Sequence, residues 1–138
     1  MTVEVSDGTN TDNATITISL NNFSKLGLST KVVEVLDTIG FETPTPVQEQ
    51  AIPILLEHNP TDFIGLAQTG TGKTAAFGLP LLDLIDQDNP STQALIMAPT
   101  RELVQQIAQQ LSQFCNNNKK INIVVVFYYC WQRSQMQT

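Results

Sequence analysis

The stretch Ala67-Gln68-Thr69-Gly70-Thr71-Gly72-Lys73-Thr74 decides the fold of this 138-residue chain. It follows Asp62–Ala67, which is predicted to be a short buried strand, and opens a helical pattern over about Lys73–Ile85. Glycines let backbone N–H groups approach an anion closely, and the start of a helix adds partial positive charge. Lys73 can reach the outer phosphates of a nucleotide, and the Thr74 hydroxyl can hold Mg²⁺. The stretch therefore predicts a phosphate-binding loop, with an accidental glycine-rich turn as the alternative.

Strand-like and helix-like segments alternate after this loop. Gln93–Met97 and Ile121–Phe127 are short apolar runs that indicate buried strands. Between them, apolar residues recur on one helix face from Leu103 to Phe114. Apolar strands joined by helices predict an α/β fold with a parallel sheet that is covered on both faces.

Two helices are expected before the loop. The first spans about Ser29–Ile39, and Gly40 ends it. The second begins at Thr45, a suitable cap, and Gln48 follows three residues later, which is the spacing of a capping box. In the helix after the loop, Pro80 is expected to cause a kink or a break.

The charges of the chain are unevenly distributed. The whole chain carries a net charge of −6, so it is not a cationic clamp for nucleic acid. Residues 1–62 hold nine acids and two bases, whereas residues 63–138 hold four acids and five bases. We therefore expect any phosphate chemistry in the second part of the chain.

The remaining composition favours a reduced protein of the cytoplasm. The two cysteines, Cys115 and Cys130, lack the spacing of a disulfide framework or of a metal site. The longest apolar run, Ile123–Trp131, is too short to span a bilayer, and we expect no membrane partner. Residues 1–21 are rich in Thr, Asn, Asp and Ser, which predicts a mobile polar leader.

Three motifs narrow the prediction to one family. Gly40–Gln48, with Phe23 seventeen positions before Gly40, resembles the Q motif of DEAD-box ATP-dependent RNA helicases. Ala67–Thr74 matches motif I of that family, including the alanine in first place, and Pro99–Leu103 matches motif Ia. The resemblance covers about residues 22–127. It implies that residues 22–138 are the first part of an N-terminal RecA-like P-loop domain, with the Q motif in 22–50, the P-loop in 62–86 and motif Ia in 93–115.

The resemblance also implies ATP and Mg²⁺ as cofactors. A glutamine amide can pair bidentately with adenine at N6 and N7, and the family gives Gln48 this role. It places Phe23 or Phe41, and Thr43, near the base, although packing of the two rings and helix capping by Gln48 are alternatives. Lys73 and Thr74 are the expected catalytic residues, and Thr74 is the expected metal contact through the nucleotide. The full phosphate-binding set is Ala67, Gln68, Thr69, Gly70, Thr71, Gly72, Lys73 and Thr74.

RNA is the partner that the resemblance implies. Motif Ia follows a predicted strand, at the carboxyl end of the sheet where ligands of open α/β folds bind. Ordinary helix-start chemistry is the alternative, with Thr100 as the cap and Glu102 favouring the helix dipole. The expected RNA-contacting residues are Pro99, Thr100, Arg101 and Glu102.

Other parts of the family pattern are missing from this sequence. No Asp-Glu-Ala-Asp or Ser-Ala-Thr motif occurs, and Tyr128-Tyr129 stand where the family usually has two glycines. We therefore expect an N-terminal fragment of an ATP-dependent RNA helicase that does not unwind RNA alone. The alternatives are a truncated, non-catalytic nucleotide-binding fragment and a different small P-loop kinase or GTPase. The oligomeric state is not predicted.

Overall fold

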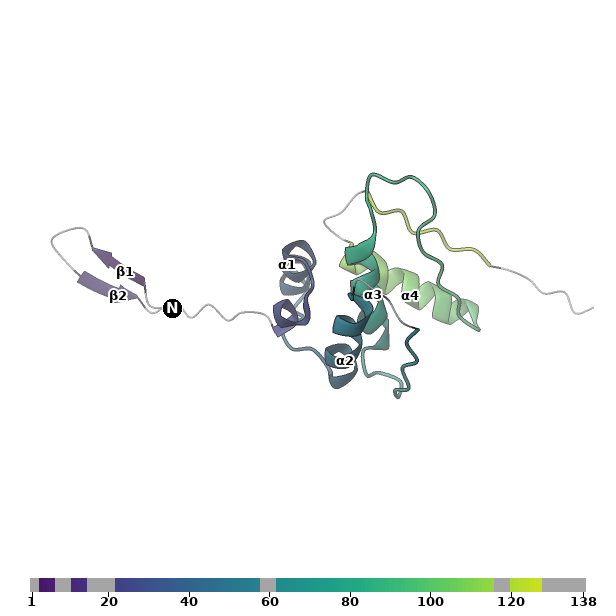
Figure 1. The fold of residues 1–138 in the computed structure, drawn as a ribbon, viewed down its shortest axis with the longest axis horizontal. Coiled ribbons are helices and arrows are strands. Elements are labelled where there is room, and N and C mark those ends of the chain that lie inside the picture. The colour runs from purple at the N-terminus through teal and green to yellow at the C-terminus, as the bar shows by residue number, and fades with distance from the viewer. Residues whose placement is uncertain (1–2, 7–10, 15–21, 58–61, 116–119, 128–138) are drawn as a thin grey trace, which may run out of the picture.

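Among the residues that the structure describes, four α-helices pack together around a core (Figure 1). The computed structural model describes residues 3–6, 11–14, 22–57, 62–115 and 120–127. Among these residues, no helix is long and apolar enough to cross a membrane. In chain order the elements are strands β1 (Val3–Ser6) and β2 (Thr11–Ala14), the short 3-10 helix η1 (Asn22–Leu26), and helices α1 (Thr30–Thr38), α2 (Pro46–Leu55), α3 (Lys73–Leu84) and α4 (Arg101–Phe114).

Helix α3 is the centre of the core and contacts each of the other three α-helices. Its Leu79 side chain is completely buried, as are Leu36 of α1 and Ile52 of α2. From α4, Leu111 packs into the same cluster, where it lies against the backbone of Gly78. The helix that begins at the predicted phosphate loop is therefore fixed by apolar packing on several sides.

The predicted break at Pro80 is wrong, because α3 runs through this residue as one helix, whereas the alternative of a kink stays a prediction. Proline lacks the N–H that would bond to the carbonyl four residues back, so its place in a helix needs compensation. The Pro80 side chain is fully buried in the core, and this packing supplies a stabilising contribution. Helix α2 likewise contains a proline, Pro53.

The ends of the helices follow the predicted signals. Gly40 has φ +79° just after α1, its N–H bonds to the Asp37 carbonyl at 3.2 Å, and the Phe41 N–H bonds to the Leu36 carbonyl at 2.9 Å. This pattern is a Schellman motif, which explains why a glycine stands there. At the start of α4, the Thr100 hydroxyl accepts a hydrogen bond from the Leu103 N–H at 3.2 Å, so the predicted cap is confirmed.

An acidic side chain of α3 holds the start of α1. The Asp83 carboxylate accepts hydrogen bonds from the N–H of Ser29, at 3.0 Å, and from the Ser29 hydroxyl. Ser29 is the N-cap of α1, whose own side chain caps no helical N–H. Asp83 therefore supplies the negative charge that a helix start favours, from a residue 54 positions along the chain.

The parallel sheet that the sequence predicts is not formed by the described residues. Their single sheet is the antiparallel pair β1–β2, in which Val3 pairs with Ala14; no pattern in the sequence predicted this pair. The segments 62–67, 93–97 and 121–127 carry no strand assignment. A strand needs a hydrogen-bonded neighbour, and none of the three segments has one in the structure. The parallel sheet therefore stays a prediction.

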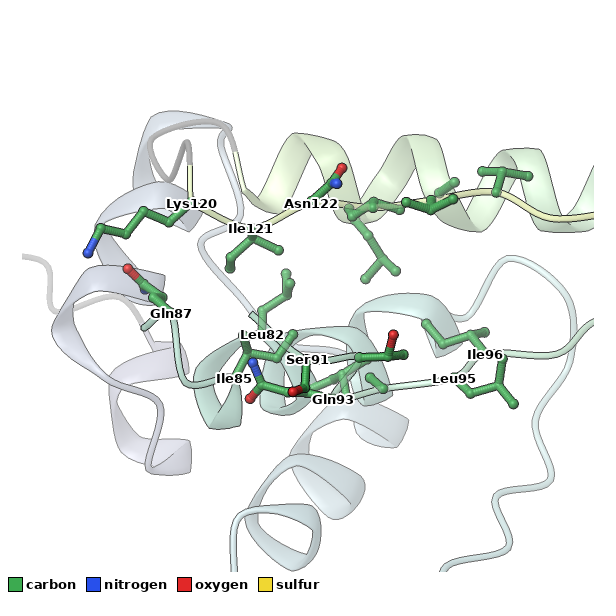
Figure 2. A pocket seen from close by; sticks show the side chains of 18 of the residues that line it. Leu82, Ile85, Gln87, Ser91, Gln93, Leu95, Ile96, Lys120, Ile121 and Asn122 are labelled. Atoms are coloured by element: carbon green, nitrogen blue, oxygen red, sulfur yellow. The ribbon is translucent and has the colours of Figure 1, made fainter. Parts of the chain in front are cut away.

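Two of these segments still have the one-sided exposure of strands. Ile96 packs against the core, whereas its neighbours Leu95 and Met97 are more than four-fifths exposed. In the other segment, Ile123 packs against the core and Val124 is 72% exposed. Between the segments lies a cavity of about 770 Å³, also lined by residues of α3 and α4 (Figure 2).

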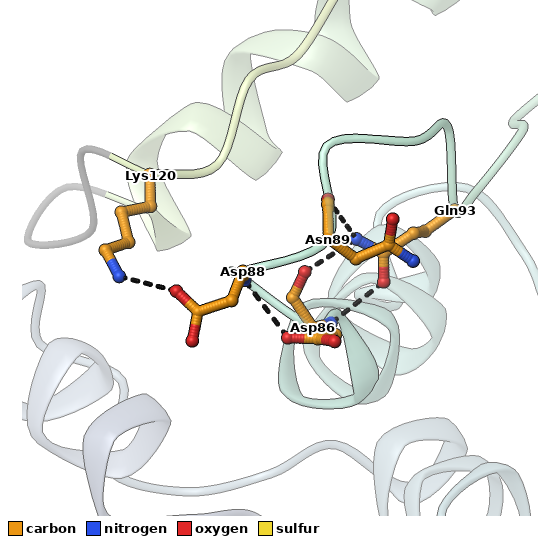
Figure 3. A network of polar contacts seen from close by, with 5 residues as sticks. All are labelled: Asp86, Asp88, Asn89, Gln93 and Lys120. Atoms are coloured by element: carbon orange, nitrogen blue, oxygen red, sulfur yellow. Dashed lines mark hydrogen bonds and ion pairs between the residues drawn. The ribbon is translucent and has the colours of Figure 1, made fainter.

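A polar network orders the loop that leads into the first of these segments (Figure 3). The Gln93 amide accepts from the Asp86 N–H at 2.9 Å and donates to the Asp86 carbonyl at 2.7 Å. Lys120, at the start of the second segment, forms an ion pair of 2.9 Å with Asp88 of the same loop. Both side chains of this pair are exposed, so it contributes little to stability, yet it brings the two segments together at one end.

Cys115 fits the prediction of a small apolar cysteine. It is half-buried directly after α4 and packs against the core. Burial raises the pKa of the Cys115 thiol, because desolvation disfavours the thiolate. The thiol is therefore less nucleophilic at neutral pH than an exposed cysteine would be.

The central position of α3 gives a direct stability test. Replacing the fully buried Leu79 by Ala should lower the free energy of unfolding by about 2–5 kcal/mol. The same change at Leu84, which is 62% exposed on the same helix, should cost well under 1 kcal/mol. Urea unfolding followed by circular dichroism measures both; equal losses would contradict the packing described here.

Candidate functional site

The predicted phosphate loop forms a tight turn between residue 67 and α3. Gly70 has φ +82° and Gly72 has φ +84°, a left-handed conformation that other residues adopt only with strain. The Thr71 hydroxyl donates to the Gln68 carbonyl at 2.8 Å and closes the turn. Gly72 is the N-cap of α3, so the loop leads directly into the start of a helix, as the sequence predicts.

The start of α2 is hydrogen-bonded to the two last carbonyls of this loop. The Thr45 hydroxyl donates to the Thr71 carbonyl at 2.8 Å, and the Gln48 side-chain amide donates to the Gly72 carbonyl at 3.1 Å. The Gln48 amide oxygen accepts from the Thr45 N–H at 2.9 Å, and the predicted capping box is present. Gln48 is only 2% exposed, so these bonds form away from solvent.

These bonds determine where the neighbouring N–H groups point. A trans peptide is planar, so the N–H of one residue points opposite to the carbonyl of the residue before it. All described peptide bonds are trans. Because α2 holds the carbonyls of Thr71 and Gly72, the N–H groups of Gly72 and Lys73 point away from α2. The loop thus presents backbone donors at a helix start, which is the arrangement that binds anions.

The Lys73 side chain is hydrogen-bonded to the first two residues of the loop. Its ammonium group donates to the carbonyls of Ala67 and Gln68, the latter at 2.8 Å. Such a group can exchange two carbonyl oxygens for phosphate oxygens, which carry more negative charge. Thr74, the second residue of α3, is half-buried beside it. The loop therefore fits a nucleotide phosphate, and Thr74 offers one hydroxyl ligand for its Mg²⁺.

The described residues also limit where a metal ion could bind. Among the described residues, no group of three or more His, Cys, Asp or Glu side chains could bind an ion. A Mg²⁺ ion usually keeps several waters and binds protein groups together with substrate phosphates. The donor set near Thr74 fits an ion that arrives with the nucleotide better than one bound by the protein alone.

The side chains predicted near the base lie partly in the core. Phe23 is completely buried, with its ring centroid 6.4 Å from that of Phe41. Phe41 in turn meets Phe114 of α4 edge-to-face at 5.8 Å, which matches the packing alternative for both rings. Thr43 is exposed. The Gln48 side chain lies against the P-loop and not in open solvent. Contact of Phe23, Phe41, Thr43 or Gln48 with a base stays a prediction.

The predicted RNA-contacting residues form an exposed group at the start of α4. Pro99, Thr100, Arg101 and Glu102 are all exposed. The guanidinium carbon of Arg101 lies 4.5 Å from the ring centroid of Phe127. Sequence reasoning missed this partner, since Phe127 is 26 positions away and its apolar segment indicated only a strand.

Comparison with known proteins decides the family. The model for DEAD/DEAH box helicases matches residues 45–137, which is more than half of the chain and contains the P-loop and motif Ia. The chain belongs to the DEAD/DEAH box helicase family. The family predicted from the sequence is thereby confirmed.

Relatives within this family extend far beyond the chain. It is 48% identical over 105 residues to the ATP-dependent RNA helicase CshA of Limosilactobacillus reuteri, covering 76% of the chain and 20% of the relative. It is 44% identical over 105 residues to the ATP-dependent RNA helicase DeaD of Escherichia coli K12, covering 76% of the chain and 16% of the relative. The chain thus spans a fifth or less of these two helicases.

Solved structures of the family support the fold. S. cerevisiae Dbp5 bound to RNA and ADP BeF3 matches with a TM-score of 0.67 and 35% identity, over 70% of this chain and 25% of Dbp5. A DEAD box protein from the hyperthermophile Methanococcus jannaschii matches with a TM-score of 0.63 and 38% identity, over 67% of this chain and 25% of that one. These matches show that the chain has part of the RecA-like fold of the DEAD-box family, and its parallel sheet stays a prediction.

The contact between α2 and the P-loop predicts a specific cost for changing Gln48. Gln48→Met keeps the size of the side chain but removes both hydrogen bonds, so unfolding should become easier by about 1–2 kcal/mol. The control is Gln50→Met, since Gln50 is exposed on the same helix and should tolerate the change. Thermal melting of the two variants tests this prediction, and equal melting temperatures for Gln48→Met and Gln50→Met would refute the contact.

Proposed function

We propose that this chain is the ATP-binding N-terminal part of an ATP-dependent RNA helicase. The observation that carries the proposal is the P-loop at the start of α3, with its carbonyls bonded to Thr45, Gln48 and Lys73. Those bonds leave N–H groups at the helix start for an anion. Residues 22–138 would make up this part of the domain, and residues 1–21 a mobile polar leader.

The triphosphate would bind around the residues 67–74. Lys73 would leave the Ala67 and Gln68 carbonyls and bind the outer phosphates. The Thr74 hydroxyl would contact Mg²⁺, whose charge offsets the negative charge that the phosphates carry. Lys73 and Thr74 are thus the residues of this chain that we place closest to the reacting phosphate. Hydrolysis itself is a property that we propose for the longer protein.

Gln48 would select adenine. Its amide has one donor and one acceptor on a planar group, which matches N6 and N7 of adenine, whereas guanine presents two acceptors there. In the structure this amide bonds to Thr45 and Gly72, so recognition requires the side chain to use its second N–H and second lone pair, or to turn. Phe41, which is half-buried, and Thr43 are the neighbours proposed for the base.

RNA would bind at the start of α4. Thr100 and Arg101 are exposed there, and the partial positive charge of a helix start favours a phosphate. The similar structure of Dbp5 was solved with RNA, which supports RNA as the partner for this chain too. Pro99 and Glu102 complete the proposed contact.

The parallel sheet would form when further strands of the domain are present. The segments 93–97 and 121–127 bury alternate side chains against α3 and α4, as strands of such a sheet do. The cavity of about 770 Å³ between them has the place and the apolar lining for a strand. Leu95 and Val124, both largely exposed, would then lie under a covering layer.

The cytoplasm remains the location that we expect for the protein.

A nucleotide titration tests the proposed function. Fluorescent ADP should bind to the chain in the presence of Mg²⁺, and fluorescent GDP should bind at least tenfold more weakly, about 1.4 kcal/mol or more. Lys73→Ala should abolish binding because it removes the phosphate contact, whereas Lys31→Ala, an exposed lysine of α1, should leave it unchanged. Equal affinity for the two nucleotides would refute adenine selection, and favour a different P-loop enzyme. Binding that survives Lys73→Ala would refute the P-loop assignment.

A further inference from the structure

We propose that Phe127 is a positioning residue for RNA binding, which holds the guanidinium plane of Arg101 in the orientation that meets an RNA phosphate. The proposal rests on the function proposed above, in which Arg101 contacts RNA. Neither the motifs nor the comparisons assign a role to Phe127.

Arg101 and Phe127 lie at the distance of a cation–π contact. The guanidinium carbon of Arg101 lies 4.5 Å from the ring centroid of Phe127, well within the distance of a cation–π contact. Arg101 is the first residue of α4 and is exposed, whereas Phe127 is half-buried at the end of the segment 120–127. The ring is therefore the less exposed member of the pair.

The chemistry of arginine is the second argument. A guanidinium carries its N–H donors around its edge, so a ring against one face leaves the edge directed outward. An edge of this kind binds two oxygens of one phosphate, which demands a fixed plane. An arginine held by an aromatic ring also loses less side-chain entropy on binding than one that moves freely.

The position of the pair is the third argument. Thr100 caps α4, and the partial positive charge of this helix start lies beside Arg101, the first residue of the helix. The segment that ends in Phe127 begins at Lys120, which forms an exposed ion pair with Asp88. Phe127 thus connects the RNA-contacting helix start to a separate segment of the domain.

Arginine and lysine differ at such a site. A lysine keeps the charge of Arg101 but has no plane to lie on a ring and binds phosphate as a point charge. Phosphate recognition that depends only on charge would tolerate Arg101→Lys. Recognition that depends on the oriented plane would lose affinity, and by about the same amount as removal of the ring.

The test is the binding of a short fluorescent oligouridylate to the full chain, followed by anisotropy at low salt and over a salt series. Phe127→Leu and Arg101→Lys should each weaken binding about two- to fivefold, the size expected of an exposed cation–π contact. The double variant should be no weaker than Arg101→Lys alone, because both changes remove the same contact. Phe127→Tyr, which keeps the ring, should bind as the unchanged chain does.

Controls separate this role from effects on folding. Val126→Ala, an exposed change next to Phe127, should leave RNA affinity unaltered. If Phe127→Leu lowers the melting temperature, Arg101→Lys still tests the contact, because Arg101 is the exposed member of the pair. The proposal is overturned when Arg101→Lys binds like the unchanged chain, or when Phe127→Leu weakens binding equally in the Arg101→Lys background. In the latter case the ring acts on RNA bases or on the fold.

The salt series adds a readout that a structural role does not move. Loss of a phosphate contact lowers the steepness of the salt dependence, so Phe127→Leu should flatten it together with the loss of affinity. Unchanged steepness with lower affinity would place Phe127 against the bases and overturn the proposal. An unchanged chain that binds no oligouridylate even at low salt would refute RNA binding itself, and the proposal with it.

Discussion

The contact between the start of α2 and the end of the P-loop is the constraint on which the candidate site depends. Thr45 and Gln48 together bind the carbonyls of Thr71 and Gly72, in surroundings where Gln48 is almost fully buried. A buried hydrogen bond that is lost costs more than one exposed to water, because the freed group stays without a partner. The peptide planes of the loop, and hence its anion-binding N–H groups, follow from these two contacts.

Gly72 is required both by the backbone conformation of the P-loop and by the close approach of α2. Gly72 has φ +84°, and a Cβ atom there would also collide with the Gln48 amide. The backbone conformation of the P-loop and the close approach of α2 thus require the same residue. On the other side, the packing of Leu79 and of its neighbours holds α3, the helix that this loop begins. Chemistry at the helix start therefore depends on apolar contacts further along the same helix.

Local signals made most of the helices and the loop predictable. Caps and stops such as Thr45, Thr100 and Gly40 act on residues within a few positions, so their effect is visible in the sequence. Contacts between distant segments were not predictable in this way. The bonds of Gln48 to Gly72 and of Ser29 to Asp83 have no local pattern, and neither does the cation–π contact of Arg101 with Phe127. The parallel sheet stays a prediction, because apolar runs indicate strands but do not show which neighbours those strands pair with.

The most direct measurement of the central claim compares the unchanged chain with Thr45→Val by amide hydrogen exchange and ADP titration. Valine keeps the shape of threonine but cannot donate to the Thr71 carbonyl. The account predicts faster exchange at the P-loop amides, and weaker ADP binding, while amides in the middle of α4 stay equally protected. Unchanged exchange and ADP affinity in Thr45→Val would contradict the claim that α2 holds the loop in its binding shape.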